Sequence, residues 1–155
     1  MPVFEIFEGL TKSETARIFN LGIIRPIEEG TILFHKGDIG HELFVVLTGK
    51  IVIFDESESE MTDIAELGPG EFFGEMAIFE SSHERSAGAM ARESSQVMII
   101  SEENLDKLIE KKAPRRFLSN IIGVLCHRLR LTNSLYMRSK YGDKMAPEIE
   151  QFSGA

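Results

Sequence analysis

The hydrophobic pattern changes twice along the chain, and its middle part, residues 23–100, has the pattern of many short strands. Apolar runs there are short or alternate with polar residues, and clusters of Gly, Pro and Asp separate them. The runs are 31–34, 43–47, 51–54, 64–67, 86–91 and 97–100. Closely spaced short strands between regular turns predict a mainly β domain, a double-stranded β-helix (jelly-roll) barrel or a sandwich.

The N-terminal part has helical signals instead. Apolar residues at mixed spacing over 3–10 suggest a short packed helix. Thr11 followed by Glu14 is a capping-box signature, which predicts that a second helix opens there. Gly22 fits as the end of this helix.

The C-terminal part is also helical in pattern. Ser101 is a candidate N-cap for one helix, and Pro114 suits the first turn of a longer helix that reaches about Tyr141. We therefore expect one domain over 1–142, made of N-terminal helices (1–22), a β-barrel (23–100) and C-terminal helices (101–141), followed by a flexible polar tail (143–155).

Two apolar stripes run along the expected helix 114–141. One follows the 4-3-4-3-4 spacing of a coiled-coil seam: Leu118, Ile122, Leu125, Leu129, Thr132 and Tyr136. The other consists of Phe117, Ile121, Val124, Leu131 and Leu135. Two stripes favour two partners, its own barrel and a second copy of the chain, so we expect a homodimer through this helix. One wide buried face is the simpler alternative.

Composition limits the class of protein. At 155 residues with a hydrophobic share of 43%, the chain suits one globular domain. No apolar run is long enough to span a bilayer, and the start has no signal-peptide pattern. The only cysteine, Cys126, cannot form an internal disulfide. A reducing cytoplasm is therefore the expected location.

The charge is unevenly distributed. The net charge is −8, yet residues 111–140 carry eight Lys or Arg and no Asp or Glu. A basic helix can indicate contact with nucleic acid. We favour the plainer interpretation, a cationic helix that lies on an acidic body.

The stretch with the most distinctive chemistry is 73–87. Gly74 allows close approach of a ligand to the backbone, Glu75 can accept hydrogen bonds from hydroxyl groups, and a short helix can begin here. Ten residues later, Arg85 offers the planar fork that matches phosphate oxygens. Together these groups suit a phosphorylated sugar. The alternative is a surface turn with a solvated glutamate and arginine.

This stretch resembles the phosphate-binding cassette of the cyclic nucleotide-binding domain family, which includes bacterial cAMP receptor proteins and regulatory subunits of cAMP-dependent protein kinase. Phe73-Gly74-Glu75-Met76-Ala77-Ile78 and Arg85-Ser86-Ala87 match the family pattern. A second motif of the family, Gly37-Asp38-Ile39-Gly40 followed by an apolar strand and Gly49, is also present. The resemblance covers about residues 24–137.

The resemblance implies a role for each matched residue. Glu75 would accept from the ribose 2′-hydroxyl, Arg85 would pair with the cyclic phosphate, and backbone N–H groups of the cassette would complete the phosphate cradle. On the long helix, Thr132 aligns with a threonine that contacts the base, and Asn133 replaces the family's serine. The implied cyclic nucleotide-binding residues are Gly74, Glu75, Met76, Ala77, Arg85, Ser86, Ala87, Thr132 and Asn133.

The expected function is therefore a regulatory sensor that binds a cyclic nucleotide, with cAMP favoured over cGMP. No helix-turn-helix domain fits in the residues after 142, so the output would be a rearrangement of the dimer or of the surface offered to an unidentified downstream protein. We expect neither an enzyme nor a metal cofactor, because His35, His41, His83 and His127 are scattered without metal-ligand spacing. The same fold could also serve as a ligand-free interaction module, or as a haem sensor using His83, His127 or Cys126.

Overall fold

The computed structural model describes residues 4–57, 60–110 and 115–142. The chain divides into two compact units, residues 1–117 and 118–155, and each is described by itself. The predicted flexible tail 143–155 and Pro114 lie outside the described residues.

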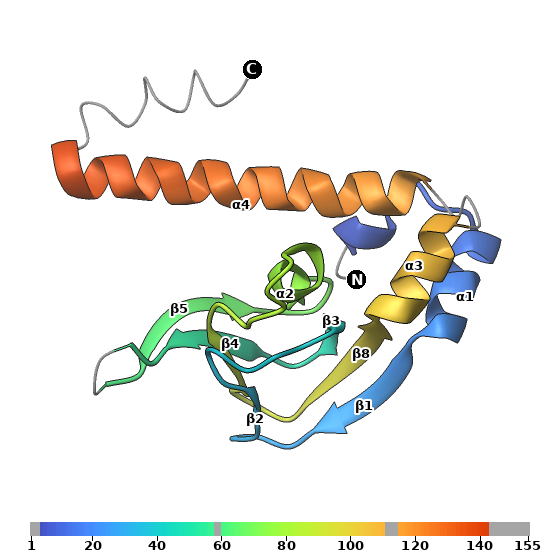
Figure 1. Ribbon diagram of the computed structural model, residues 1–155, viewed down its shortest axis with the longest axis horizontal. Helices are drawn as coiled ribbons and strands as arrows, with labels where there is room; N and C mark the ends of the chain where they lie inside the picture. The colour runs from blue at the N-terminus through green and yellow to red at the C-terminus, as the bar shows by residue number, and fades with distance from the viewer. Residues whose placement is uncertain (1–3, 58–59, 111–114, 143–155) are drawn as a thin grey trace. The chain divides into compact units, whose positions relative to one another are not determined.

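The first unit contains two antiparallel sheets, which Figure 1 shows as the curved strands of the β-rich part. One sheet has the order β1-β8-β3-β6, with bounds Ile23–Ile27, Ser95–Ser101, Glu42–Thr48 and Phe72–Phe73. The other has the order β2-β7-β4-β5, with bounds Ile32–Phe34, Gly88–Ala91, Ile51–Asp55 and Thr62–Leu67. Strands far apart in sequence are neighbours, as in β1 with β8 and β4 with β7.

The hydrophobic core lies between the two sheets. Both sheets contribute small and large apolar side chains to one buried cluster: Ile27, Phe44, Val46, Ile51, Leu67, Phe73, Ala89, Ala91 and Val97. Phe54 of β4 is fully buried, and Gly88 leaves room for its ring because a Cβ there would overlap it. The core therefore holds two facing sheets together.

Three helical segments of the first unit lie where the sequence signals predict helix, and the first of them is shorter than expected. The expected helix over 3–10 is only a single 3-10 turn, Glu5–Phe7. Helix α1 spans Lys12–Leu21 and begins with the predicted capping box, in which the side chains of Thr11 and Glu14 each accept the other's backbone N–H. Helix α3 spans Glu102–Glu110, and the Ser101 hydroxyl accepts the N–H of Asn104 at 3.2 Å. The predicted N-caps of both helices are thus confirmed.

Helix α4 spans Arg115–Tyr141, and its residues 118–141 belong to the second unit. Large apolar side chains of both predicted stripes are exposed along it: Ile122, Leu129, Leu131, Leu135 and Tyr136. Within the described residues, no helix has both the length and the apolar character required to cross a membrane.

The mainly β fold with helices at both ends is confirmed, with one difference. The described strands form two separate four-stranded sheets and not a closed barrel. The outer strands β1, β6, β2 and β5 each pair on one side only, which leaves both sheets open. Pro26 fits this arrangement, because it lies in β1, an edge strand, where a missing backbone donor is tolerated.

Candidate functional site

The cassette begins where strand β6 turns into the short helix α2, Glu75–Phe79. Gly74 links them with a φ of 85°, in the left-handed region that favours glycine. A Cβ on Gly74 would also lie 2.8 Å from Nη1 of Arg85 and 3.0 Å from the carbonyl oxygen of Glu42. The glycine is therefore required both by the turn and by the close approach of the arginine.

Arg85 is the centre of the site. Only 4% of this residue is exposed. Its Nη1 donates to the carbonyl oxygens of Glu42 at 3.1 Å and of Gly74 at 3.0 Å, and its Nη2 donates to Oε2 of Glu42 at 3.2 Å. The guanidinium also stacks over the ring of Phe34, with Cζ 4.3 Å from the ring centroid. These contacts hold the cation in one orientation inside the first unit.

The two sequence motifs meet at this arginine. The N–H of Gly37 donates to the carbonyl oxygen of Arg85 at 2.8 Å, and the N–H of Arg85 donates to the carbonyl oxygen of Asp38 at 2.7 Å. Gly40 is buried against the guanidinium, and a Cβ there would overlap Nε, Cζ and Nη2. The glycine motif at 37–40 therefore forms the wall of the pocket that holds Arg85.

The guanidinium of Arg85 is a buried cation among three carboxylates. Burial lowers the pKa of Arg85, while the nearby carboxylates of Glu42, Asp38 and Glu75 oppose this shift. The guanidinium nevertheless stays charged, because arginine is not deprotonated in proteins. The hydrogen bonds described for it use three of the five N–H donors that a guanidinium carries. The remaining donors are suited to oxygen atoms of a phosphate.

The other cassette residues surround Arg85 from α2 and the approach to β7. Glu75 is buried, with 8% exposed, in the first turn of α2, and Ala77 is buried one residue beyond Met76. Ser86 is exposed, and its hydroxyl lies 3.5 Å from Sδ of Met76, which links the two halves of the cassette. Ala87 is buried at the entry to β7. The structure thus brings together seven of the nine predicted residues, Gly74 to Ala77 and Arg85 to Ala87.

The other two predicted residues lie on α4, in the second unit. Thr132 is exposed and donates its hydroxyl to the carbonyl oxygen of Arg128 at 2.9 Å, and Asn133 is exposed beside it. Since the two units are described separately, a contact of these residues with the base remains a prediction from the resemblance.

Sequence reasoning missed the immediate partners of Arg85. Glu42, Phe34 and Phe44 contact the guanidinium from strands β2 and β3, more than forty positions away in the sequence. No local pattern marks them, although Glu42 closely follows the glycine motif. The histidines were also judged scattered, and this was wrong for two of them: the rings of His41 and His83 lie 4.4 Å apart, centroid to centroid, beside Glu102.

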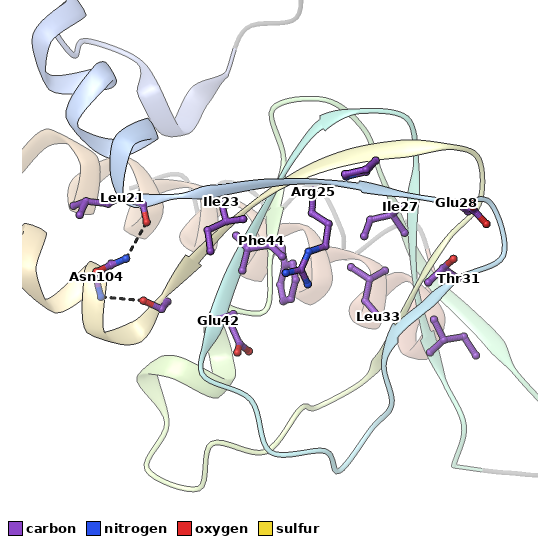
Figure 2. Close-up of a pocket in the computed structure, with 14 residues that line it drawn as sticks. Leu21, Ile23, Arg25, Ile27, Glu28, Thr31, Leu33, Glu42, Phe44 and Asn104 are labelled. Atoms are coloured by element: carbon purple, nitrogen blue, oxygen red, sulfur yellow. Dashed lines mark hydrogen bonds between the residues drawn. The ribbon is translucent and has the colours of Figure 1, made fainter.

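A cavity of about 790 Å³ adjoins these partners, and Figure 2 shows its lining. Arg25 and Ile27 of β1 and Glu42 and Phe44 of β3 are among the residues that line it. Asn104 closes one end, where its side chain donates to the carbonyl oxygen of Leu21 at 2.9 Å. The lining shares Glu42 and Phe44 with the surroundings of Arg85 but contains no cassette residue. The cassette, and not this cavity, is therefore the candidate ligand site.

Comparisons with known proteins find similar sequences and similar folds. The chain is 32% identical over 126 residues to the cyclic AMP receptor protein of Thermus thermophilus, covering 81% of this chain and 57% of that protein. The crystal structure of the Thermus thermophilus catabolite activator protein superposes with a TM-score of 0.77 at 31% identity, covering 87% of this chain and 63% of that one.

A third relative has a different ligand in its description. The c-di-GMP-responsive global regulator CLP of Xanthomonas campestris superposes with a TM-score of 0.74 at 28% identity, covering 86% of this chain and 66% of that one.

This chain spans about half the length of the curated relatives that it matches, 57% of the first and 48% of the next. A family model described as cyclic nucleotide-binding domain matches residues 24–112. The chain belongs to the cyclic nucleotide-binding domain family.

Proposed function

We propose that this chain binds a cyclic nucleotide, cAMP in preference to cGMP, and acts as a cytoplasmic regulatory sensor without catalytic activity. The observation that carries the proposal is the buried guanidinium of Arg85, which donates to the carbonyl oxygen of the left-handed Gly74, the residue before the buried Glu75. A cyclic phosphate would accept hydrogen bonds from the guanidinium of Arg85 and from the N–H groups at the start of α2. Glu75 would accept from the ribose 2′-hydroxyl.

Binding of the nucleotide would be an exchange of acceptors. Glu42 is half-exposed and already accepts from Nη2 of Arg85 at 3.2 Å. A phosphate that approaches this donor competes with the Glu42 carboxylate for it. The phosphate contact would thereby free Glu42, a residue at the start of β3, and so change the protein surface.

The signal would pass through a homodimer formed by α4. Leu129 of the predicted seam is 61% exposed, and Ile122 and Tyr136 of the same seam are exposed as well. Such an apolar stripe on a charged helix suits the seam of a helix pair. The nucleotide can shift the dimer between two arrangements only if it binds one of them more tightly, and Thr132 and Asn133 on the same helix would supply that difference. A downstream protein would then recognise the favoured arrangement.

The ligand is tested by isothermal titration of the purified chain with cAMP, cGMP and c-di-GMP. Arg85→Leu removes the phosphate partner, and we expect it to weaken binding by about 2–5 kcal/mol because a buried charge is left unpaired. Arg92→Leu is the matched control, since Arg92 is a half-exposed arginine that pairs with Asp63 outside the cassette. Equal affinity of wild type and Arg85→Leu would refute the site assignment. Tightest binding of cGMP or c-di-GMP would reassign the ligand.

One observation favours a second function. Arg85 already has three internal acceptors, so the fold can be stable without any ligand. A folded protein that binds none of the three nucleotides would be a ligand-free interaction module, in which Arg85 only joins β3 to the cassette.

The dimer is tested by sedimentation velocity. Leu129→Asp places a charge in the proposed seam, and we expect it to shift the protein from dimer to monomer. Ser119→Asp, at an exposed position outside both stripes, should leave the dimer intact. A monomeric wild type would refute the role of α4.

A further inference from the structure

Three side chains from separate segments meet beside the cassette. His41 precedes β3, His83 lies between α2 and β7, and Glu102 is the first residue of α3. Nδ1 of His41 lies 2.8 Å from Oε2 of Glu102, and Nδ1 of His83 lies 3.9 Å from the same oxygen. One potential ligand atom from each residue lies within 4.8 Å of the other two.

Backbone hydrogen bonds hold the three segments in place. The N–H of Glu102 donates to the carbonyl oxygen of His41 at 2.7 Å, and the N–H of Gly40 donates to the carbonyl oxygen of His83 at 2.9 Å. The three ligand positions are therefore fixed to one another by the folded backbone and not only by contacts between their side chains.

One nitrogen of His83 is held by a hydrogen bond to the backbone, as is common in metal-binding histidines. Its Nδ1 lies 2.8 Å from the carbonyl oxygen of Ala77, which can only accept, so the proton of this bond is on Nδ1 and Nε2 keeps its lone pair. Metal-binding histidines commonly donate the N–H of their second ring nitrogen to a backbone carbonyl in this way. His83 is also the one residue other than glycine with positive φ, 55°, in the described part of the chain. Such backbone conformations concentrate at functional sites.

We propose that His41, His83 and Glu102 form a binding site for a divalent transition-metal ion, with Zn²⁺ as the ion that this donor set suits best. Two imidazoles and one carboxylate are a ligand set of known zinc sites, in which a water molecule takes the fourth position. With zinc–ligand distances of about 2.0–2.2 Å, ligand atoms in a tetrahedral site lie about 3.4 Å apart. Rotations of the three side chains, all of them partly exposed, can close the difference from the present spacing.

A second histidine–glutamate pair in this chain shows what an ordinary ion pair looks like. Nδ1 of His35 lies 2.7 Å from Oε1 of Glu56, and the exposed fractions of these side chains are 52% and 30%. The corresponding fractions for His41 and Glu102 are 51% and 29%. The two pairs match in distance and exposure, and they differ in that His83 stands beside the second one. The His35 pair is therefore the internal control.

The position of the site gives it a consequence that rests on the proposed function. His83 is two residues before Arg85 and bonds to Ala77 of the cassette helix. A bound ion would fix this loop, and by linkage Zn²⁺ and the nucleotide would change each other's affinity by the same factor. The metal site itself is tested without any nucleotide, so its failure is distinct from failure of the nucleotide proposal.

The test is equilibrium dialysis of the untagged protein against Zn²⁺, with Co²⁺ as a spectroscopic probe of coordination. All proteins carry Cys126→Ser, which removes the exposed thiol of α4 as a competing ligand. Compared with this parent are His83→Asn, which keeps a residue tolerated at positive φ, Glu102→Gln and the control His35→Gln. Circular dichroism without metal checks that each protein is folded, and His41→Gln, at a half-exposed position, replaces any variant that is not.

We expect one equivalent of Zn²⁺ bound to the parent and to His35→Gln, with visible absorption bands of four- or five-coordinate Co²⁺. His83→Asn and Glu102→Gln should bind at least tenfold more weakly and lose those bands. Absence of stoichiometric binding by the parent would overturn the proposal. Equal affinity of the parent and His83→Asn, or an equal loss in His35→Gln, would also overturn it.

Discussion

Gly40→Ala tests whether the glycine motif is the wall that holds Arg85. A Cβ at this buried position would overlap the guanidinium, well inside the 3.0 Å that real Cβ atoms keep from other heavy atoms. The guanidinium would have to move away from the carbonyl oxygens of Glu42 and Gly74. Hydrogen bonds from charged donors contribute about 1.5–3 kcal/mol each. Replacement of a glycine by alanine also stabilises the folded state by about 0.4–1 kcal/mol, because it reduces the conformational entropy of the unfolded chain. Since the displaced donors can re-form some bonds, we expect a net destabilisation of about 2–4 kcal/mol.

The assay is urea unfolding followed by circular dichroism, because the chain contains no tryptophan. Gly40→Ala should lower the midpoint without changing the slope, and it should also weaken nucleotide binding because it displaces Arg85. Gly68→Ala is the matched control, since nothing lies within 4 Å of a Cβ there. It should be neutral or slightly stabilising. If Gly40→Ala unfolds at the same urea concentration as Gly68→Ala, the placement of Arg85 against the glycine is wrong.

Three further predictions concern the core, an exposed ion pair and the acceptor of Arg85. Phe54→Ala should cost about 3–5 kcal/mol in the same urea assay, because the fully buried ring leaves a cavity, and a cost below about 1 kcal/mol would contradict that burial. The hydrogen bond to Glu56 raises the pKa of His35, so an NMR titration should give a value above 6.5. The stability from this pair is then fully present below pH 6.5 and lost as the pH rises through the raised value, and Glu56→Gln should reduce that dependence because it removes the largest cause of the shift. Glu42→Gln should tighten nucleotide binding by up to about fivefold, or about 1 kcal/mol, since the half-exposed carboxylate no longer competes for Arg85, and weaker binding in calorimetry would refute the exchange.

The sequence predicted most of the strands because their apolar residues alternate or cluster between turns. Six predicted runs became strands β2, β3, β4, β5, β7 and β8. Strand β1 was missed because four of its five residues are exposed and one is Pro26, so it carries no core-facing alternation. Strand β6 has only two residues and is defined by its pairing with β3, which is not visible in a local pattern. The capping residues of α1 and α3 were found because caps depend on neighbours in sequence.

The difference between features set by neighbours in sequence and features set by distant contacts also explains what could be predicted of the candidate site. The cassette was found because Gly74, Glu75 and Arg85 lie within twelve positions and have a recognisable order. The partners of Arg85 were missed because they come from β2 and β3 and have no required spacing to it. His41 and His83 were missed for the same reason, since pairing of residues 39 and 84 brings them together across 42 positions.

The internal pairing of Arg85 bears on how a sensor of this kind can switch. A ligand shifts a conformational equilibrium only by as much as it binds one state more tightly than the other. A phosphate that merely added contacts to a preformed cradle would leave the rest of the unit unchanged. In the function proposed above, Glu42 would provide this difference, because its carboxylate accepts from Nη2 of Arg85, where a phosphate oxygen would compete with it. Glu42 directly follows His41, whose carbonyl oxygen accepts the first N–H of α3. In the proposed exchange, displacement of this carboxylate would act on the segment that is hydrogen-bonded to α3, and Glu42→Gln should mimic this displacement without nucleotide.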